Sequence, residues 1–144
     1  SQKNFWMAMR AVDMTGRRAA LAKRAVRVAS RAARIAGAPS AAMGLFLVGE
    51  ARMKALNKKY RGKDNGANVL SFSYELPVPH PEFGKRYRGE VYLCPAYITA
   101  HGEEFDRMAV HGVLHVLGYD HETDAEAERM ERLERRILGL SLKF

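Results

Sequence analysis

The first clear pattern along the chain is a helical one. Between residues 17 and 35, apolar side chains recur at steps of four and three positions, namely Leu21, Ala25, Val28, Ala32 and Ile35. At about 100° per residue, these positions lie on one side of an α-helix. Gly37 and Pro39 follow, and both residue types are common just beyond the end of a helix. The pattern therefore predicts a helix over 17–35 that belongs to the fold.

Short apolar runs in the middle of the chain predict strands. Residues 45–48 are apolar and stand between two glycines, which is typical of a strand buried on both faces. From Leu70 to Glu75, apolar and polar residues alternate, which is the period of a strand with two unlike faces. Residues 91–94 predict another strand, and the prolines between 77 and 81 predict a loop before it.

Helical segments are expected between and after these strands. Residues 50–60 predict a short helix, Pro95 can open another, and residues 103–117 predict a longer one. Thr123 and Glu126 have the spacing of a capping box, which indicates that a last helix begins there. The apolar side of that helix consists of Met130, Leu133 and Ile137.

The composition is that of an ordinary globular protein. The 144 residues are 47% hydrophobic and 28% charged, which suits one domain with its own core. No apolar run approaches the roughly 20 residues of a membrane helix, and no secretory signal is evident. A single cysteine, Cys94, fits a reducing compartment. We therefore expect a single cytoplasmic domain over 1–144 with no membrane partner.

The net charge of +8 is unevenly distributed. Residues 1–40 contain nine Lys or Arg and one acid, Asp13, whereas 41–144 are balanced. The predicted helix carries a second stripe, beside its apolar side, made of Arg24, Arg27, Arg31 and Arg34. Such asymmetry favours an anionic partner, but a solvated basic face would look the same. Both interpretations stay open for the basic part over 1–40, which we expect to hold a strand and a helix.

The most informative segment contains His111, His115 and His121, three of the five histidines of the chain. Four residues make just over one helical turn, so His111 and His115 lie about 40° apart on one helix face. Gly118 can take the left-handed conformation that ends the helix and turns the chain back, which returns His121 to the pair. Three imidazoles with a fourth position left for water are typical of catalytic zinc. The spacing therefore predicts one zinc ion per chain at these three residues.

The same spacing raises the alternative of a metallopeptidase. Peptidases of the metzincin type have the pattern H-E-x-x-H-x-x-G-x-x-H, and this segment matches each of its histidines and its glycine. Gly112 stands where that pattern has the glutamate that acts as general base. The sequence thus disfavours a protease without excluding other zinc hydrolases.

The histidine segment resembles the signature of the YbeY endoribonucleases. That segment is HGVLHVLGYDH at 111–121, and two further stretches support the resemblance, LNKKYRGKD at 56–64 with NVLSF at 68–72, and GEVYLCP at 89–95. The resemblance runs from about Leu45 to Leu138, so we take 41–144 as the family core. Two departures are visible, since Gly66-Ala67 replaces the usual Pro-Thr and the segment between Cys94 and His111 is shorter than usual.

This resemblance implies a single-domain α+β fold of the zincin type, with a small mixed β-sheet, helices packed on it, and the zinc site on a helix and the loop after it. It also implies a hydrolase, an endoribonuclease that cleaves single-stranded RNA in the maturation of small-subunit ribosomal RNA and in ribosome quality control. The expected partners are single-stranded RNA, ribosomal RNA and the small ribosomal subunit, and no small-molecule cofactor beyond the metal is expected.

Arg61 matches an arginine that the family places in the cleft, so the resemblance makes it a catalytic candidate beside the histidines. An arginine near zinc can hold a phosphate group through two hydrogen bonds. The basic residues around it, Lys58, Lys59 and Lys63, would add contacts that release counterions. For Tyr60, packing is favoured over stacking on a base.

A third interpretation is a non-catalytic RNA- or ribosome-binding module with a structural zinc. Structural zinc has four protein ligands as a rule, so a fourth ligand would favour this class, and Asp120 and Glu104 are nearest in sequence. His80 and His101 lie in polar loop contexts and receive no role. The sequence leaves open the cleavage site, the nucleophile, the general base, the oligomeric state and the native metal, because three imidazoles also suit nickel or copper.

Overall fold

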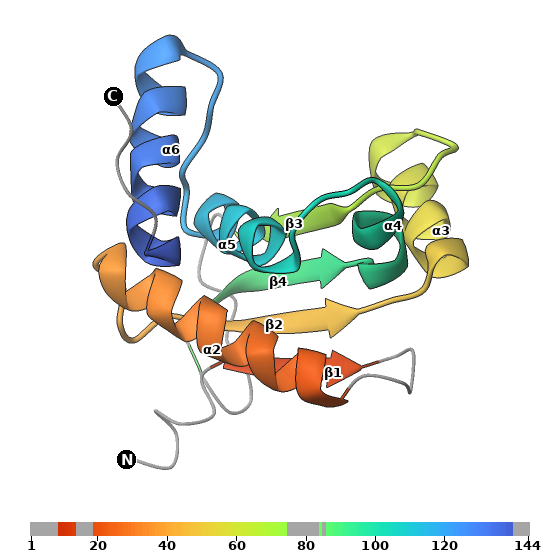
Figure 1. The fold of residues 1–144 in the computed structure, drawn as a ribbon, viewed down its shortest axis with the longest axis horizontal. Helices are drawn as coiled ribbons and strands as arrows, with labels where there is room; N and C mark the ends of the chain where they lie inside the picture. Colours follow the sequence, from red (N-terminus) through yellow and green to blue (C-terminus); the bar gives the residue numbers. More distant parts are fainter. Residues whose placement is uncertain (1–8, 14–18, 75–83, 85, 140–144) are drawn as a thin grey trace.

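The computed structural model describes residues 9–13, 19–74, 84 and 86–139. These residues form an α+β fold in the chain order shown in Figure 1: β1 (Met9–Asp13), α2 (Ala19–Ile35), β2 (Ala42–Leu47), α3 (Glu50–Arg61), β3 (Val69–Ser73), β4 (Tyr87–Leu93), α4 (Pro95–Ala100), α5 (Phe105–Val116) and α6 (Asp124–Leu138). The predicted α+β class and mixed sheet are confirmed. No helix within the described part of the chain is both long and apolar enough to cross a membrane.

The four strands form one mixed sheet in the order β1-β2-β4-β3. Strand β2 pairs in parallel with both β1 and β4, while β3 pairs with β4 in the antiparallel direction. Strand β3 is therefore an edge of the sheet formed by the described residues. Helix α2 lies against β1, and α5 lies against β3 and β4, so the apolar side of the sheet is covered by these two helices (Figure 1).

The main core lies between the sheet and these helices. It contains Leu45 and Leu47 of β2, Val91 and Leu93 of β4, and Leu114 of α5, each at most 1% exposed. Five of the six residues of β2 are buried, which confirms a strand covered on both faces. The prediction placed its start too late, because Gly44 interrupts the apolar run while remaining in the strand.

Helix α2 begins at Ala19 and ends at Ile35, the end that its apolar period predicts, while the first two residues of the predicted helix lie outside the described residues. Two arginines of its basic stripe are engaged within the protein. The guanidinium of Arg24 donates to both carboxylate oxygens of Asp106 on α5, at 2.6 and 2.9 Å. The Nε of Arg31 donates to the carbonyl of Ile137 on α6 at 2.6 Å. The stripe therefore also fastens α2 to the two C-terminal helices, which the sequence pattern did not indicate.

Strand β4 starts at Tyr87, four residues before the predicted apolar run. Its first half is polar, and its register against β2 shifts between Ala42 and Met43. Gly89 lies at this irregularity with φ of 157°, and a Cβ there would meet the carbonyl oxygen of Phe72 at 2.0 Å. A strand that is polar and irregular lacks the continuous period by which sequence patterns are recognised.

Helix α3 positions the residues at its C-terminal end. Its apolar side packs through the buried Met53 against a second hydrophobic cluster next to the sheet. Gly62 adopts the left-handed conformation at φ 69° and ends the helix directly after Arg61. The buried Asn57 then donates to the backbone carbonyl of Asn65 at 2.9 Å, which holds the following turn against the helix.

Helix α6 begins with the predicted capping box. The Thr123 hydroxyl accepts from the backbone N–H of Glu126 at 3.1 Å, and the Glu126 carboxylate accepts from the N–H of Thr123 at 3.1 Å. Met130 and Ile137 are buried as expected, and Glu131 forms an i,i+4 ion pair with Arg135 at 3.8 Å. Met130 and Ile137 belong to the main core, to which α5 contributes Leu114.

Candidate metal centre

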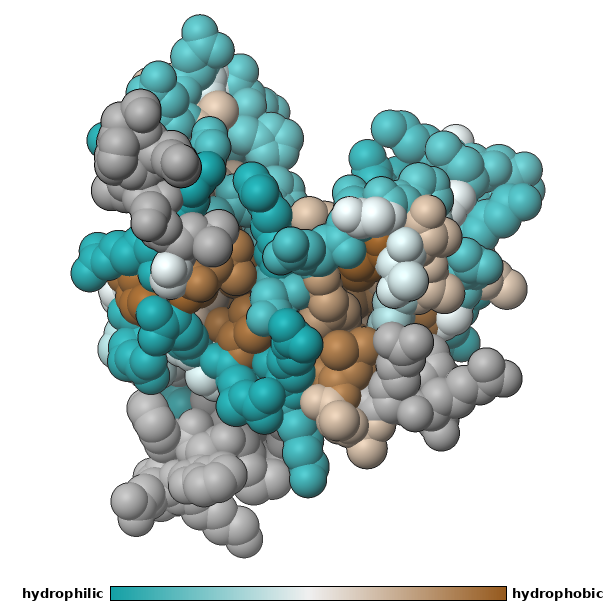
Figure 2. All heavy atoms as spheres, viewed as in Figure 1, coloured by the Kyte–Doolittle hydropathy of each residue, from teal (hydrophilic) through white to brown (hydrophobic). Residues whose placement is uncertain are grey.

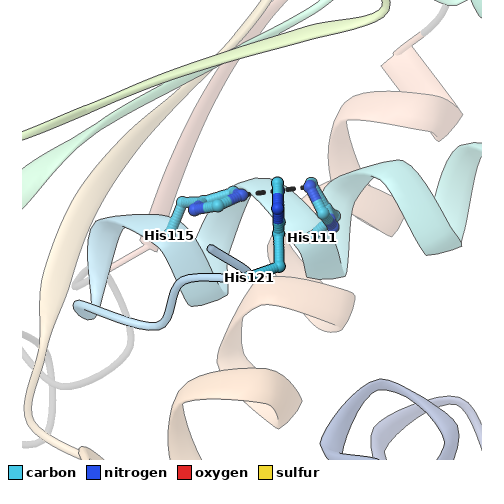
Figure 3. Close-up of side chains that lie close together, drawn as sticks. All are labelled: His111, His115 and His121. Atoms are coloured by element: carbon cyan, nitrogen blue, oxygen red, sulfur yellow. Dashed lines mark hydrogen bonds between the residues drawn. The ribbon is translucent and has the colours of Figure 1, made fainter. Parts of the chain in front are cut away.

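Helix α5 and the loop after it bring the three predicted histidines together. His111 and His115 project from the same face of α5, and His121 turns toward them from the loop (Figure 3). One ligand atom from each residue lies within 4.8 Å of those of the other two. The Nε2 atoms of His111 and His115 are 3.0 Å apart. Two nitrogens bound to one tetrahedral zinc would be roughly 3.3 Å apart, so the cluster fits that ion.

The local backbone explains why His121 returns to the helix. The N–H of Gly118 donates to the carbonyl of His115 at 3.0 Å, and that of Tyr119 donates to the carbonyl of Leu114 at 2.9 Å. Gly118 has φ of 100°, so the chain reverses at a glycine, as the sequence predicts. The N–H of His121 donates to Oδ1 of Asp120 at 2.7 Å, which fixes the loop near the third ligand.

The electrostatic setting favours a neutral imidazole at His115. Burial lowers the pKa of His115 below its usual value, and the neighbouring His111 and His121 lower this pKa further. A histidine whose pKa is lowered is neutral near pH 7 and offers a free lone pair to a metal ion. The donor chemistry of the cluster therefore suits a divalent transition metal.

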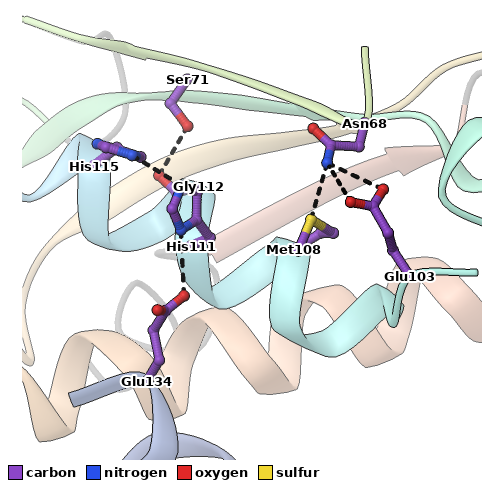
Figure 4. A network of polar contacts seen from close by, with 8 residues as sticks. All are labelled: Asn68, Ser71, Glu103, Met108, His111, Gly112, His115 and Glu134. Carbon is purple, nitrogen blue, oxygen red and sulfur yellow. Dashed lines mark hydrogen bonds and ion pairs between the residues drawn. The ribbon is translucent and has the colours of Figure 1, made fainter. Parts of the chain in front are cut away.

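Glu134 of α6 is a functional candidate that sequence reasoning missed. Its carboxylate is buried, with the residue 8% exposed, and its Oε2 lies 3.2 Å from Nδ1 of His111 (Figure 4). Because Nε2 of His111 faces His115, the other ring nitrogen is left to donate to the carboxylate. Such a contact fixes the tautomer and orientation of a ligating imidazole. A signal was present, since Glu134 stands four residues after the buried Met130 and three before Ile137, on the apolar side of α6.

Gly112 lies at the closest approach of α5 to the sheet. A Cβ at this position would meet Cγ1 of Val91 at 2.7 Å and Cγ2 of Val69 at 2.9 Å. The carbonyl of Gly112 accepts a hydrogen bond from the Ser71 hydroxyl at 2.9 Å. The residue that stands in place of the peptidase glutamate thus faces β3 and β4, with no room for a side chain.

A cavity of about 530 Å³ joins the histidines to Arg61. Its walls come from the end of α3, strand β3, helix α5 and the loop after it, with lining residues Arg61, Asn68, Val69, Leu70, Ser71, Phe72, Ser73, Met108, His111, His115 and His121. Figure 2 shows the surface hollowed between α6 and the segment that follows α3, with hydrophilic side chains on both sides. The structure therefore brings together all four of the predicted site residues.

The surroundings of Arg61 are basic and polar. Lys58, Lys59 and Lys63 are exposed near it, on the last turn of α3 and the turn beyond. Tyr60 is 55% exposed and meets the ring of Phe72 edge-on, with ring centroids 5.1 Å apart. The packing contact expected for Tyr60 is present, although more than half of its surface stays open.

A polar network links strand β3 to helix α5 at the wall of the cavity. The amide Nδ2 of Asn68 donates to both carboxylate oxygens of Glu103 at 3.1 Å and contacts Sδ of Met108 at 3.2 Å (Figure 4). These contacts link the start of β3 to the segment that leads into α5. They hold β3 at a set distance from the helix that carries the histidines.

The candidates for a fourth ligand do not join the cluster. Within the described ranges, the metal-binding group contains the three histidines alone, without Asp120 or Glu104. Glu104 precedes α5 as its N-cap residue and is exposed. His101 stacks on Tyr97 at a centroid distance of 3.8 Å, so it has a packing role, and His80 lies outside the described residues.

Comparison with known proteins agrees with this geometry. The fold and the cluster define an α+β protein with a candidate three-histidine metal centre beside a cleft. The family model of Endoribonuclease YbeY matches residues 9–141, and the chain belongs to this family. The Endoribonuclease YbeY of Chelativorans sp. is 40% identical over 129 residues, covering 82% of this chain and 76% of that protein.

Two other relatives are matched over a shorter part. The Endoribonuclease YbeY of Halorhodospira halophila is 44% identical over 101 residues, covering 65% of this chain and 66% of that protein. That of Thermodesulfovibrio yellowstonii is 39% identical over 106 residues, and the match spans 65% of its length. Both matches thus span slightly less than two thirds of the relative. A solution structure from Thermotoga maritima shares the fold, with a TM-score of 0.55, 23% identity, and coverage of 91% of this chain and 89% of that one.

Proposed function

We propose that this chain is a zinc-dependent endoribonuclease that cleaves single-stranded RNA. The observation that carries the proposal is the cavity that has Arg61 and the three histidines on its walls. Family membership supports the same activity. We place the activity in one catalytic domain over 1–144, with 41–144 as its core and one zinc ion per chain held by His111, His115 and His121.

The cellular setting that we propose follows from the same relationship. The protein acts in the cytoplasm on ribosomal RNA of the small subunit, in maturation and in ribosome quality control. The basic residues on and after α3 and the exposed arginines of α2 supply the positive surface that such a substrate requires. Their distribution over two separate helices suits a large RNA rather than a small ligand.

The residues of the chain divide the chemistry between them. A bound zinc ion supplies Lewis-acid chemistry toward phosphoryl oxygen and water. His111, His115 and His121 hold that ion, and Glu134 holds His111 in the orientation that points Nε2 at the cluster. Arg61 offers a guanidinium to the scissile phosphate and stabilises the negative charge that grows on it in the transition state.

The two alternative functions are less well supported. A metallopeptidase needs a glutamate beside the first histidine, and a Cβ at Gly112 would lie only 2.7 and 2.9 Å from the methyl groups of Val91 and Val69, which leaves no room for that side chain. A structural zinc module needs a fourth protein ligand, and the donor group in the described part of the chain contains three. Both observations favour a site that keeps one coordination position for substrate chemistry.

The proposal is tested by metal analysis together with cleavage of labelled RNA. We expect about one zinc per chain and zinc-dependent cutting of a single-stranded oligonucleotide, with the matching duplex resistant. The His115→Ala variant is the control, because a contaminating ribonuclease would not depend on this residue. Equal cleavage by the purified protein and by His115→Ala would refute the proposal.

A further inference from the structure

The cavity runs along the outer edge of strand β3. All five residues of β3, Val69–Ser73, line it. Successive residues of a strand point to opposite faces of the sheet. A cavity bordered by five consecutive residues therefore follows the edge of the strand rather than one of its faces. Since β3 ends the strand order of the sheet, this edge is not covered by another strand of the described sheet.

The hydrogen bonds to β4 show which backbone groups of β3 face the cavity. The carbonyl of Asn68 accepts from the N–H of Cys94, and the N–H of Tyr74 donates to the carbonyl of Arg88, both at 3.0 Å. In an antiparallel pair, residues bonded to the partner alternate with residues whose N–H and C=O point away from it. The even-numbered residues of β3 thus bond to β4. The N–H and C=O groups of the odd-numbered residues point into the cavity.

Val69, Ser71 and Ser73 therefore present their backbone N–H and C=O groups at this edge. One of the three N–H groups is already hydrogen-bonded within the protein. The N–H of Val69 is satisfied by Oδ1 of Asn68 at 2.7 Å. The N–H groups of Ser71 and Ser73 have no partner among the residues that the structure describes. The Ser71 hydroxyl is committed to the carbonyl of Gly112, whereas the side chain of Ser73 is exposed. Within the described ranges, two backbone donors, two residues apart, thus remain for a bound molecule.

We propose that the sugar–phosphate backbone of the RNA substrate lies along this edge of β3. The N–H groups of Ser71 and Ser73 donate to phosphate oxygens, and the outward carbonyls of the same strand accept from ribose 2′-hydroxyl groups. Backbone N–H groups are common phosphate donors, and the 2′-hydroxyl is the group by which proteins distinguish RNA from DNA. This inference rests on the proposed ribonuclease function and adds the path of the substrate and the basis for choosing RNA.

The charges at the cavity favour a polyanion over an extended peptide as the occupant. An open strand edge can also pair with a peptide. However, Arg61 lines this cavity, and the exposed Lys58, Lys59 and Lys63 lie within three residues of Arg61 in the chain. Cations placed next to neutral donors suit a chain of phosphates, which gains from both. A peptide would use the donors and leave the cations without partners.

Proline at position 73 tests the backbone donor directly. Ser73→Pro removes the N–H, and proline is tolerated on an edge strand where this group points outward. Ser73→Ala keeps the N–H and removes the hydroxyl, so the comparison between the two variants isolates the donor. With the full zinc-loaded chain, we expect labelled single-stranded RNA to bind Ser73→Pro about tenfold more weakly than Ser73→Ala, by fluorescence anisotropy read before cleavage. Equal dissociation constants would overturn the proposal.

The salt dependence separates this contact from the basic surface. An amide N–H carries no charge, so Ser73→Pro should keep the slope of log K against log salt that Ser73→Ala has. In contrast, Lys58→Gln should reduce that slope by about 0.7, the value for one phosphate contact with a single strand. A slope change in Ser73→Pro comparable to that of Lys58→Gln would contradict a neutral donor at this edge.

A measurement on the unaltered protein covers the case in which Ser73→Pro does not fold. In the ¹⁵N-labelled zinc-loaded chain, single-stranded RNA should shift the amide signals of Ser71 and Ser73 and slow their hydrogen exchange. The matched DNA strand should bind more weakly. Unmoved amide signals, equal binding of DNA, or displacement of RNA by an uncharged extended peptide that moves the same signals would each overturn the inference. Cleavage of RNA by the wild-type protein in the same samples shows whether the proposed function itself stands.

Discussion

Glu134 is expected to orient His111, one of the three proposed zinc ligands, without binding the metal itself, and this role can be tested by mutation. Replacing it by Ala removes the buried carboxylate that lies 3.2 Å from Nδ1 of His111. Partners of this kind affect metal affinity by about 10- to 100-fold when they are lost. That range corresponds to roughly 1.4–2.8 kcal/mol, at 1.4 kcal/mol for each factor of ten. Because Glu134 is only 8% exposed, water does not easily replace it, and we expect the upper part of the range.

Zinc affinity would be measured by competition with a fluorescent chelator, and the ligand geometry by the visible spectrum of the cobalt-loaded protein. Glu134→Gln retains an acceptor oxygen without the charge, so its loss should be smaller than that of Glu134→Ala. Glu131→Gln is a matched control on the same helix, since its exposed carboxylate pairs with Arg135 at 3.8 Å. Wild-type zinc affinity in a folded Glu134→Ala variant would show that the contact does not support the site.

Four further predictions concern the ligands, the cleft and the basic helix. His115→Ala should lose most of its zinc affinity yet keep its circular dichroism spectrum, because the chain has its own core; full zinc occupancy would contradict the ligand assignment. Arg61→Ala should lower the cleavage rate by a factor of roughly 10²–10³, with a much smaller loss of RNA affinity. An unchanged cleavage rate would show that Arg61 is a solvated surface residue without a catalytic role. Arg27→Gln combined with Arg34→Gln should weaken binding to small ribosomal subunits and flatten its salt dependence by about 0.7–0.9 per lost contact, while wild-type binding would leave these residues without an RNA role. Arg24→Gln should instead lower the melting temperature, since its side chain pairs with Asp106, and an unchanged melting temperature would show that this exposed pair contributes little.

The cluster of three histidines could be predicted from the sequence because its determinants are local. The histidines stand within eleven residues, so helical geometry and one glycine turn are enough to bring them together. Glu134 escaped prediction because its partner lies 23 positions earlier, on another helix. The resemblance to a known family supplied Arg61, whose place in the cavity depends on how α3 and β3 pack and not on any nearby pattern.

The elements of the fold also differ in how well local sequence patterns predict them. Helices α2 and α6 were predicted well, because apolar periods of many residues and a capping box leave little ambiguity. The strand order and the antiparallel direction of β3 follow from long-range pairing, which a single sequence does not encode in a local signal. The edge position of β3 was therefore beyond prediction, although it decides which backbone groups face the cavity.

The packing of Gly112 also bears on how such a chain could change its chemistry during evolution. Replacing this glycine by glutamate, a single substitution, would create the sequence pattern of a peptidase. The protein would gain nothing from it, because Val69 and Val91 occupy the space that the first carbon of the new side chain needs. The helix would have to move away from the sheet first, which requires smaller residues at both valine positions. A protein with this fold therefore needs several coordinated substitutions to acquire peptidase chemistry. The substitutions at the two valines would leave space in the core before the new glutamate could bring any benefit.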